Sequence, residues 1–300
     1  PLADSIHRLR MSTELTQEQI QKILQGIAIP PQPQVLVDLQ MEQCKPDYSI
    51  TEIARLISQD VGLSGSILKT VNSPLYKHSN TITSISQAVN LLGANSVINL
   101  MNALSIKGAL SDDDIIAMGR FWDSAMDIAL TASFIAKQIG VPNSEEVYTL
   151  GLFHNCGIPL LMSRFDHYQD VLVQAYAATE KDITEVENEL ISTNHAVVGY
   201  YVGKSWNLPA HLCEAIHEHH GVMKTFADDK ANSRKKTLLA IIKMAEHICG
   251  NYKILGQQQV DHEWERIVDT VLIYTGISEY EYTNLEAQIT ELGLGVKNYY

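Results

Sequence analysis

The chain has 300 residues, of which 45% are hydrophobic and 19% are charged, and its formal net charge is -13 at pH 7. This length and composition support a folded core in one large domain or two lobes, and they exclude a disordered or fibrous chain. So acidic a surface repels phosphate backbones, which argues against non-specific nucleic-acid binding. The basic triplet Arg234-Lys235-Lys236 is the clearest local exception, and we interpret it as a solvated helix start.

The cysteines and the lack of long apolar stretches indicate a cytoplasmic protein. The four cysteines are far apart and form no CxxC pair: Cys44, Cys156, Cys213 and Cys249. We expect free thiols in a reducing compartment rather than a zinc knuckle or a redox pair. The chain opens at Pro1 without a basic and then apolar leader, and no stretch reaches the ~20 apolar residues of a membrane span.

Helical spacing of apolar residues dominates the first part of the chain. Ser49 and Glu52 have the spacing of a capping box, and the apolar residues behind them recur every three or four positions. Ser84 and Gln87 repeat this helix start, and Gly93 stands where that helix is expected to end. These signals predict several short helices in the first hundred residues.

An acidic run, Ser111-Asp112-Asp113-Asp114, interrupts the helical pattern. No EF-hand spacing follows it, so we interpret it as a solvated boundary between two lobes rather than as a calcium site. The expected organisation is an N-terminal extension (1–19), an N-terminal lobe (about 20–110), a second lobe (about 115–250) and a C-terminal helical extension (251–300). Because no strong alternating strand and no tandem repeat occur, the predicted fold is an all-α, two-lobed helical bundle.

The second lobe shows the same helix signals. One broad apolar face runs through residues 121–139. Asp182 and Glu185 have capping-box spacing, and Asn194 is the expected N-cap of a helix that begins at His195.

Several polar side chains fall on the apolar faces of these helices, namely His154, His195, His219 and Glu246. A buried carboxylate is costly unless it is paired or coordinated. Inward polar residues from separate helices are how helical bundles build metal sites. The alternative is a set of separate core histidines, each hydrogen-bonded to its own neighbour, and spacing alone favours that alternative.

Several sequence strings resemble a known family. Residues 151–157 (GLFHNCG) resemble the GLLHDIG signature of HD-domain metal phosphohydrolases, and residues 195–199 look like the downstream part of that family. Upstream, residues 71–74 (VNSP) and 88–93 (AVNLLG) resemble the HD-related output domain (HDOD) branch. The resemblance runs over about residues 20–250 and implies an HD-like fold for the second lobe.

The resemblance places the first-metal ligands at Ser124, His154, Asn155 and Glu246. Active HD enzymes have His, Asp and Asp where this chain has Ser124, Asn155 and Glu246. Serine and asparagine are poor ligands for a divalent transition metal, so we expect no working hydrolase and no obligatory cofactor. A weaker divalent-metal site stays open, made of His154, His195, His219, His220 and Glu246.

The resemblance implies a non-catalytic signal-transduction module that acts by binding a protein partner, because HDOD relatives are associated with bacterial signalling. Two alternatives stay open: a metal-dependent phosphohydrolase acting on a nucleotide or cyclic nucleotide, and a nucleotide-binding sensor without turnover. No membrane partner is expected.

A centre without metal requires its polar groups to satisfy one another. Hydrogen bonds among His154, Asn155, His195 and Glu246 are chemically feasible. Glu246 must then meet a protonated histidine or carry its own proton. On this basis we expect Glu246→Gln to be tolerated.

Overall fold

The computed structural model describes residues 17–29, 34–59, 61–72, 81–98, 101, 119–142 and 144–294. All regular secondary structure in these ranges is α-helical, which confirms the predicted all-α class. None of the helices described is both long and apolar enough to cross a membrane. The acidic run at 111–114 lies outside the described residues, and the predicted domain boundaries stay predictions.

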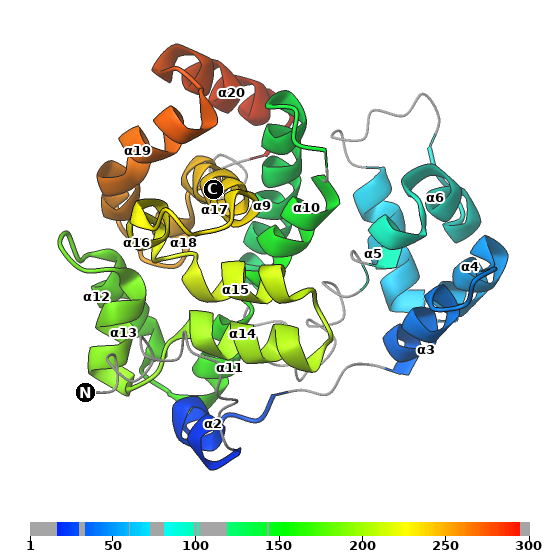
Figure 1. The fold of residues 1–300 in the computed structure, drawn as a ribbon, viewed down its shortest axis with the longest axis horizontal. Coiled ribbons are helices and arrows are strands. Elements are labelled where there is room, and N and C mark those ends of the chain that lie inside the picture. Colours follow the sequence, from blue (N-terminus) through cyan, green and yellow to red (C-terminus); the bar gives the residue numbers. More distant parts are fainter. Residues whose placement is uncertain are drawn as a thin grey trace.

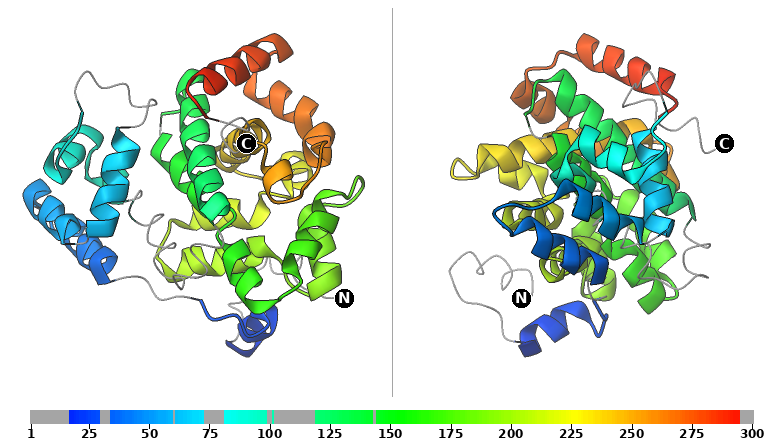
Figure 2. Two further views of the ribbon diagram at one scale, coloured as in Figure 1. Left: turned by 180° about the vertical axis from the view of Figure 1, so that it is seen from behind. Right: turned by 90° about the vertical axis from the view of Figure 1, so that its right-hand side faces the viewer.

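Four helices form a small lobe that stands beside the rest of the molecule (Figure 1 and Figure 2, left): α3 (Gln34–Gln43), α4 (Ile50–Ser58), α5 (Val61–Val71) and α6 (Ile85–Leu92). The side chain of Ser49 accepts a hydrogen bond from the backbone N–H of Glu52 at 3.3 Å, which confirms the predicted start of α4. Ser84 caps α6 in the same way through Gln87, and Gly93, at φ 82°, ends that helix.

The remaining helices form a larger lobe: α2 (Gln17–Leu24), α9 (Gly119–Gln138), α10 (Ser144–Phe153), α11 (Gly157–Arg164), α12 (Tyr168–Tyr176), α13 (Ile183–Ile191), α14 (His195–Ser205), α15 (Ala210–Glu218), α16 (Val222–Ala227), α17 (Ser233–Cys249), α18 (Asn251–Ile254), α19 (His262–Thr275) and α20 (Glu279–Glu291). The first helix, α2, packs against α14 in this lobe. Two predicted caps are confirmed, because Asp182 and Glu185 form a capping box and Asn194 accepts from Val197 N at 2.8 Å. All four cysteines are free thiols.

Helix α17 is the central element of the larger lobe. It packs against α9, α10, α15, α16 and α19, which surround it in Figure 1. Helices α19 and α20 lie on the outer side of α17 and α9 (Figure 2). Because α17 is enclosed in this way, its polar residues Lys235, Lys243 and Glu246 are buried together with its apolar ones.

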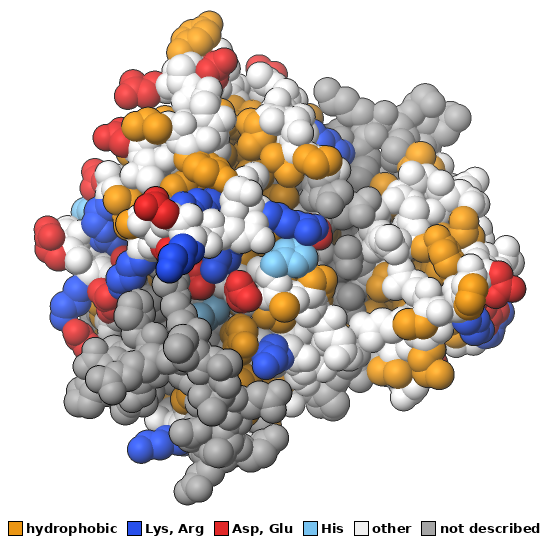
Figure 3. Space-filling model, in the orientation of Figure 1, with side chains coloured by type: hydrophobic (Ala, Val, Ile, Leu, Met, Phe, Trp, Pro, Cys, Tyr) orange, Lys and Arg blue, Asp and Glu red, His pale blue; other side chains and the backbone are white. Residues whose placement is uncertain are grey.

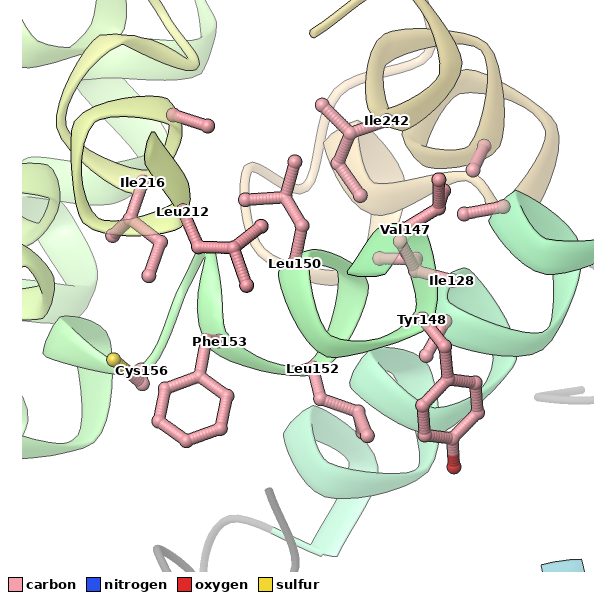
Figure 4. Close-up of a cluster of buried hydrophobic side chains, with 14 of the residues drawn as sticks. Ile128, Val147, Tyr148, Leu150, Leu152, Phe153, Cys156, Leu212, Ile216 and Ile242 are labelled. Carbon is pink, nitrogen blue, oxygen red and sulfur yellow. The ribbon is translucent and has the colours of Figure 1, made fainter. Parts of the chain in front are cut away.

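A dry apolar core holds together the helices that carry the polar side chains. Figure 4 shows Leu150 of α10 facing Leu212 of α15, with Ile242 of α17 nearby, while Phe153 of α10 lies on the side of Cys156. Each of these side chains is at most 2% exposed. The cluster continues to partly buried residues at its edge. Burial of one such side chain contributes about 1.5–3 kcal/mol. This packing fixes α10, α15 and α17 relative to one another.

Helices α11 and α14 approach each other most closely at Gly157. A Cβ atom built on Gly157 would lie 2.2 Å from the carbonyl oxygen of His195, which is far inside van der Waals contact. The contact atom is backbone and cannot rotate away. The packing therefore requires glycine at position 157, the last residue of GLFHNCG, because the backbone of His195 lies against it.

We predict that Gly157→Ala destabilises the fold by about 3 kcal/mol or more, because α11 must separate from α14. The control is Gly65→Ala in α5, where a Cβ atom meets nothing within 4 Å. That change should be neutral or stabilise by up to about 1 kcal/mol, since alanine favours a helix interior. Urea denaturation followed by circular dichroism measures both, and equal midpoints for the two variants would contradict the close packing.

Candidate metal centre

Three histidines meet in the interior of the larger lobe. His195 is the first residue of α14, and His219 and His220 follow α15 directly. Nε2 of His195 lies 3.2 Å from Nε2 of His219 and 3.1 Å from Nε2 of His220. All three side chains are buried, and together they offer nitrogen atoms within 4.8 Å of one another. Such a grouping has the size of the ligand set of one metal ion.

The other ring nitrogen of two of these histidines is held by an acceptor. Nδ1 of His195 donates to Oε2 of Glu187 at 2.8 Å, and the second oxygen of Glu187 accepts a hydrogen bond from the Tyr168 hydroxyl. Nδ1 of His219 donates to the carbonyl oxygen of Ile216 at 2.7 Å. Because a carbonyl only accepts, His219 carries its proton on Nδ1, and its Nε2 is a bare lone pair.

The third histidine is held by a carboxylate and an ammonium. Nδ1 of His220 lies 2.8 Å from Oε1 of Glu263 and 3.1 Å from Nζ of Lys243. A carboxylate only accepts and an ammonium only donates, so Nδ1 of His220 donates to Glu263 in one tautomer and accepts from Lys243 in the other. In the first tautomer Nε2 of His220 presents a lone pair to the same space.

The Nε2 atoms lie at separations that either a shared proton or a bound metal ion would bridge. Burial, aided by the neighbouring His220, Lys243 and His195, holds the pKa of His219 well below its ordinary value. Burial and Lys243 lower the pKa of His220 in the same way. Both rings are therefore neutral near pH 7, the form in which imidazole binds a metal ion. The donor set fits a divalent transition metal.

His154 and Glu246 lie beside the three histidines. His154 is one residue beyond the end of α10, and its ring meets the edge of His219 with centroids 5.3 Å apart. Its Nδ1 donates to the carbonyl of Gly151 at 2.7 Å. Its buried Nε2 has no hydrogen-bond partner in the part of the chain that the structure describes, and it lies 3.3 Å from Oε1 of Glu246. The five residues named from the sequence as an open metal set are thus brought together in one region.

The two degenerate ligand positions remain apart from the hydrogen bonds of this cluster. Ser124 and Asn155 are buried, and neither Oγ of Ser124 nor Oδ1 of Asn155 has a hydrogen-bond partner among the described residues. The sequence left open a hydrogen-bonded network of His154, Asn155, His195 and Glu246. Among the described residues Oδ1 of Asn155 has no hydrogen-bond partner, so this oxygen takes no part in such a network.

Lys243 is the partner of Glu246 that sequence reasoning missed. Its Nζ lies 2.7 Å from Oε2 of Glu246 and 3.0 Å from Oε2 of Glu263, and its side chain is 2% exposed. Asn251 Nδ2 donates to the other oxygen of Glu246 at 2.9 Å. Burial disfavours the charge of Lys243, but the two carboxylates outweigh it and raise its pKa. Glu246 is therefore paired with a lysine, whereas the sequence predicted either a protonated histidine partner or a protonated carboxyl group.

The signal for this pair was present in the sequence as an i, i+3 spacing on one helix. Glu187 and Glu263 were also missed. They reach the histidines from α13 and α19, and no spacing along the chain indicates that approach.

The family model of the HDOD domain matches residues 29–222, which is more than half of the chain. The chain belongs to the HDOD family. Three charged residues of the centre, Lys243, Glu246 and Glu263, lie beyond the matched HDOD range. The HDOD match thus contains the histidines and Glu187, but not Lys243, Glu246 or Glu263.

Known relatives share this HDOD fold. An uncharacterised protein of Treponema pallidum (strain Nichols) is 28% identical to this chain over 212 residues. The match covers 69% of this chain and 41% of the Treponema protein, so this chain spans about two fifths of that protein's length. An HDOD domain protein of Geobacter sulfurreducens has a TM-score of 0.62 at 22% identity, with 91% of this chain and 96% of that chain covered. A Shewanella amazonensis SB2B protein, provisionally named a phosphohydrolase, also has a TM-score of 0.62 at 22% identity, with 90% and 94% covered. At this identity the solved structures show a common fold.

We predict that Glu246→Gln destabilises the domain by about 2–4 kcal/mol, which reverses the tolerance expected from the sequence. The reason is that Lys243 would stay buried with one carboxylate fewer. Glu265→Gln is the control, because Glu265 is 64% exposed on α19 and should change stability by less than about 0.5 kcal/mol. Urea denaturation in the presence of a chelator compares the two variants with the wild type. A wild-type midpoint for Glu246→Gln would contradict a stabilising role for the pairing of Lys243 with Glu246.

Proposed function

We propose that this HDOD domain is a regulatory module without hydrolytic turnover, whose histidine centre holds one divalent transition-metal ion. The observation that carries the proposal is the convergence of three buried Nε2 atoms at 3.1–3.2 Å. His195, His219 and His220 would hold the ion, and imidazole nitrogens suit zinc, cobalt, nickel or iron. The bound ion would supply a positive charge that the Nε2 lone pairs of the three histidines coordinate.

The surrounding side chains orient these ligands before any ion binds. Glu187 holds the ring of His195, and Tyr168 holds Glu187. The carbonyl of Ile216 fixes the tautomer of His219. Outer partners of this kind set the direction of a ligand's lone pair and strengthen metal binding. The centre is thus preorganised for binding, and the ion would tie α14 to the end of α15.

The same region is poorly suited to phosphate hydrolysis. A metal-dependent hydrolase uses its ions to ionise water and to polarise a phosphoryl oxygen. The family's histidine and aspartate positions are occupied here by Ser124 and Asn155, which contribute no imidazole and no negative charge. The alternative of a working phosphohydrolase is therefore not favoured.

A nucleotide sensor is not favoured either. A small hollow beside the centre is lined by Glu246, Asp261 and Glu263 together with Lys243 and Trp264. Three carboxylates against one ammonium give this hollow an acidic lining, which repels a phosphate group. The charge distribution therefore supports neither a nucleotide nor a cyclic nucleotide as the ligand of the hollow.

A protein partner fits the surface of the small lobe better. Large apolar side chains are exposed there, namely Met41, Tyr48, Ile50 and Leu91. Figure 3 shows apolar side chains on the face of this lobe, with charged side chains at its outer edge. Exposed apolar surface of this kind occurs at protein interfaces. Regulation through a protein partner is the mode of action we propose.

We expect untagged protein to bind one equivalent of Co²⁺ or Zn²⁺, measured by calorimetry and by metal analysis after dialysis. His195→Ala should weaken binding at least about 100-fold, because it removes the ring that contacts both other histidines. His211→Ala is the matched control, since His211 lies on α15, is 26% exposed and pairs with Glu146. Equal binding by wild type and both variants, or no binding at all, would overturn the metal assignment.

Purified protein should hydrolyse neither bis-p-nitrophenyl phosphate nor cyclic dinucleotides above background with Mn²⁺, Fe²⁺, Ni²⁺ or Mg²⁺. The physical reason is the loss of two metal ligands at Ser124 and Asn155. His154→Ala gives the background rate. Metal-dependent turnover that disappears in His154→Ala would show that the centre is catalytic.

A further inference from the structure

Lys243 occupies an unusual place for a lysine. Its ammonium is enclosed in the larger lobe, between Oε2 of Glu246 at 2.7 Å and Oε2 of Glu263 at 3.0 Å, and it lies 3.1 Å from Nδ1 of His220. Lysine ammonium groups are strongly hydrated and are rarely buried unless paired. The two carboxylates come from different helices, α17 and α19, so Lys243 joins them across a helix interface.

The groups around this ammonium are ligands that a metal ion would use. Glu246 and Glu263 each present carboxylate oxygens, and the lone pair of His154 Nε2 faces Glu246 at 3.3 Å. Carboxylate and imidazole together bind zinc and related ions. An ion at the carboxylates would stand within contact distance of the ammonium, and two cations so close in a buried site repel each other strongly.

We propose that Lys243 is a built-in cation that takes the place of a second metal ion at Glu246 and Glu263. The ammonium contacts both carboxylates and supplies one positive charge that is covalently attached to the chain. The centre is thereby restricted to a single ion, held by the three histidines. This restriction to one ion rests on the proposed function, whereas the exclusion of metal from the carboxylates does not.

Formal charge supports the same conclusion. Glu187, Glu246 and Glu263 bring three negative charges to the centre, and Lys243 brings one positive charge. With neutral imidazoles, two net negative charges remain, which one divalent ion balances. Two divalent ions together with Lys243 would leave a net positive charge in a buried site, which is unfavourable.

The test counts the Co²⁺ ions bound per chain by equilibrium dialysis and metal analysis of untagged protein. Lys243→Met removes the charge and keeps the length of the side chain, and it should bind one ion more than the wild type. Lys235→Met is the matched control, because Lys235 is also buried on α17 and pairs with Glu214 and Glu218. It should bind the wild-type number. Adding Glu246→Gln to Lys243→Met should remove the extra ion.

The difference between Lys243→Met and wild type decides the proposal, whatever the wild type binds. An extra ion in the variant when the wild type binds none would support Lys243 and overturn the three-histidine site. Equal numbers would overturn the role of Lys243 and leave the three-histidine site intact. If Lys243→Met does not fold alone, recovery of its helical circular dichroism on adding Co²⁺ supports the proposal, and no recovery overturns it.

Discussion

The burial of charged side chains in an apolar lobe is the constraint on which the rest of this structure depends. A carboxylate or an ammonium in such a place is stable only with partners in contact. Glu187 is wholly buried and is held by Tyr168 and His195, and Lys243 is held by Glu246 and Glu263. These contacts join α13 to α14 and α17 to α19, so the polar centre and the helix packing determine each other.

The anchoring of the Nδ1 atoms connects this packing to chemistry. A histidine presents a lone pair in a defined direction only when its other nitrogen has an acceptor. His195, His219 and His220 each have one, and the acceptors are a carboxylate, a backbone carbonyl and a second carboxylate. The three lone pairs converge because three separate contacts turn the rings. The tight approach of α11 to α14 at Gly157 holds the backbone of His195 in register with them.

The residues that the HDOD family model matches include only part of the polar centre. The match ends at residue 222, whereas Lys243, Glu246 and Glu263 lie beyond it. Helix α19 contributes Glu263 directly to His220, so the C-terminal helices are part of the centre and not only a cover over it.

The sequence by itself determined the helical class, several helix starts and the family of the chain, because these depend on residues close together along the chain. The cap of Ser49 on α4 follows from a spacing of three residues, and that of Asn194 on α14 follows from its place directly before the helical run. Only the tertiary structure decided that Glu187, Lys243 and Glu263 surround the histidines. Whether a side chain on one helix reaches a ring on another depends on the rotation and crossing of helices far apart in the chain, and the packing of the whole lobe sets these.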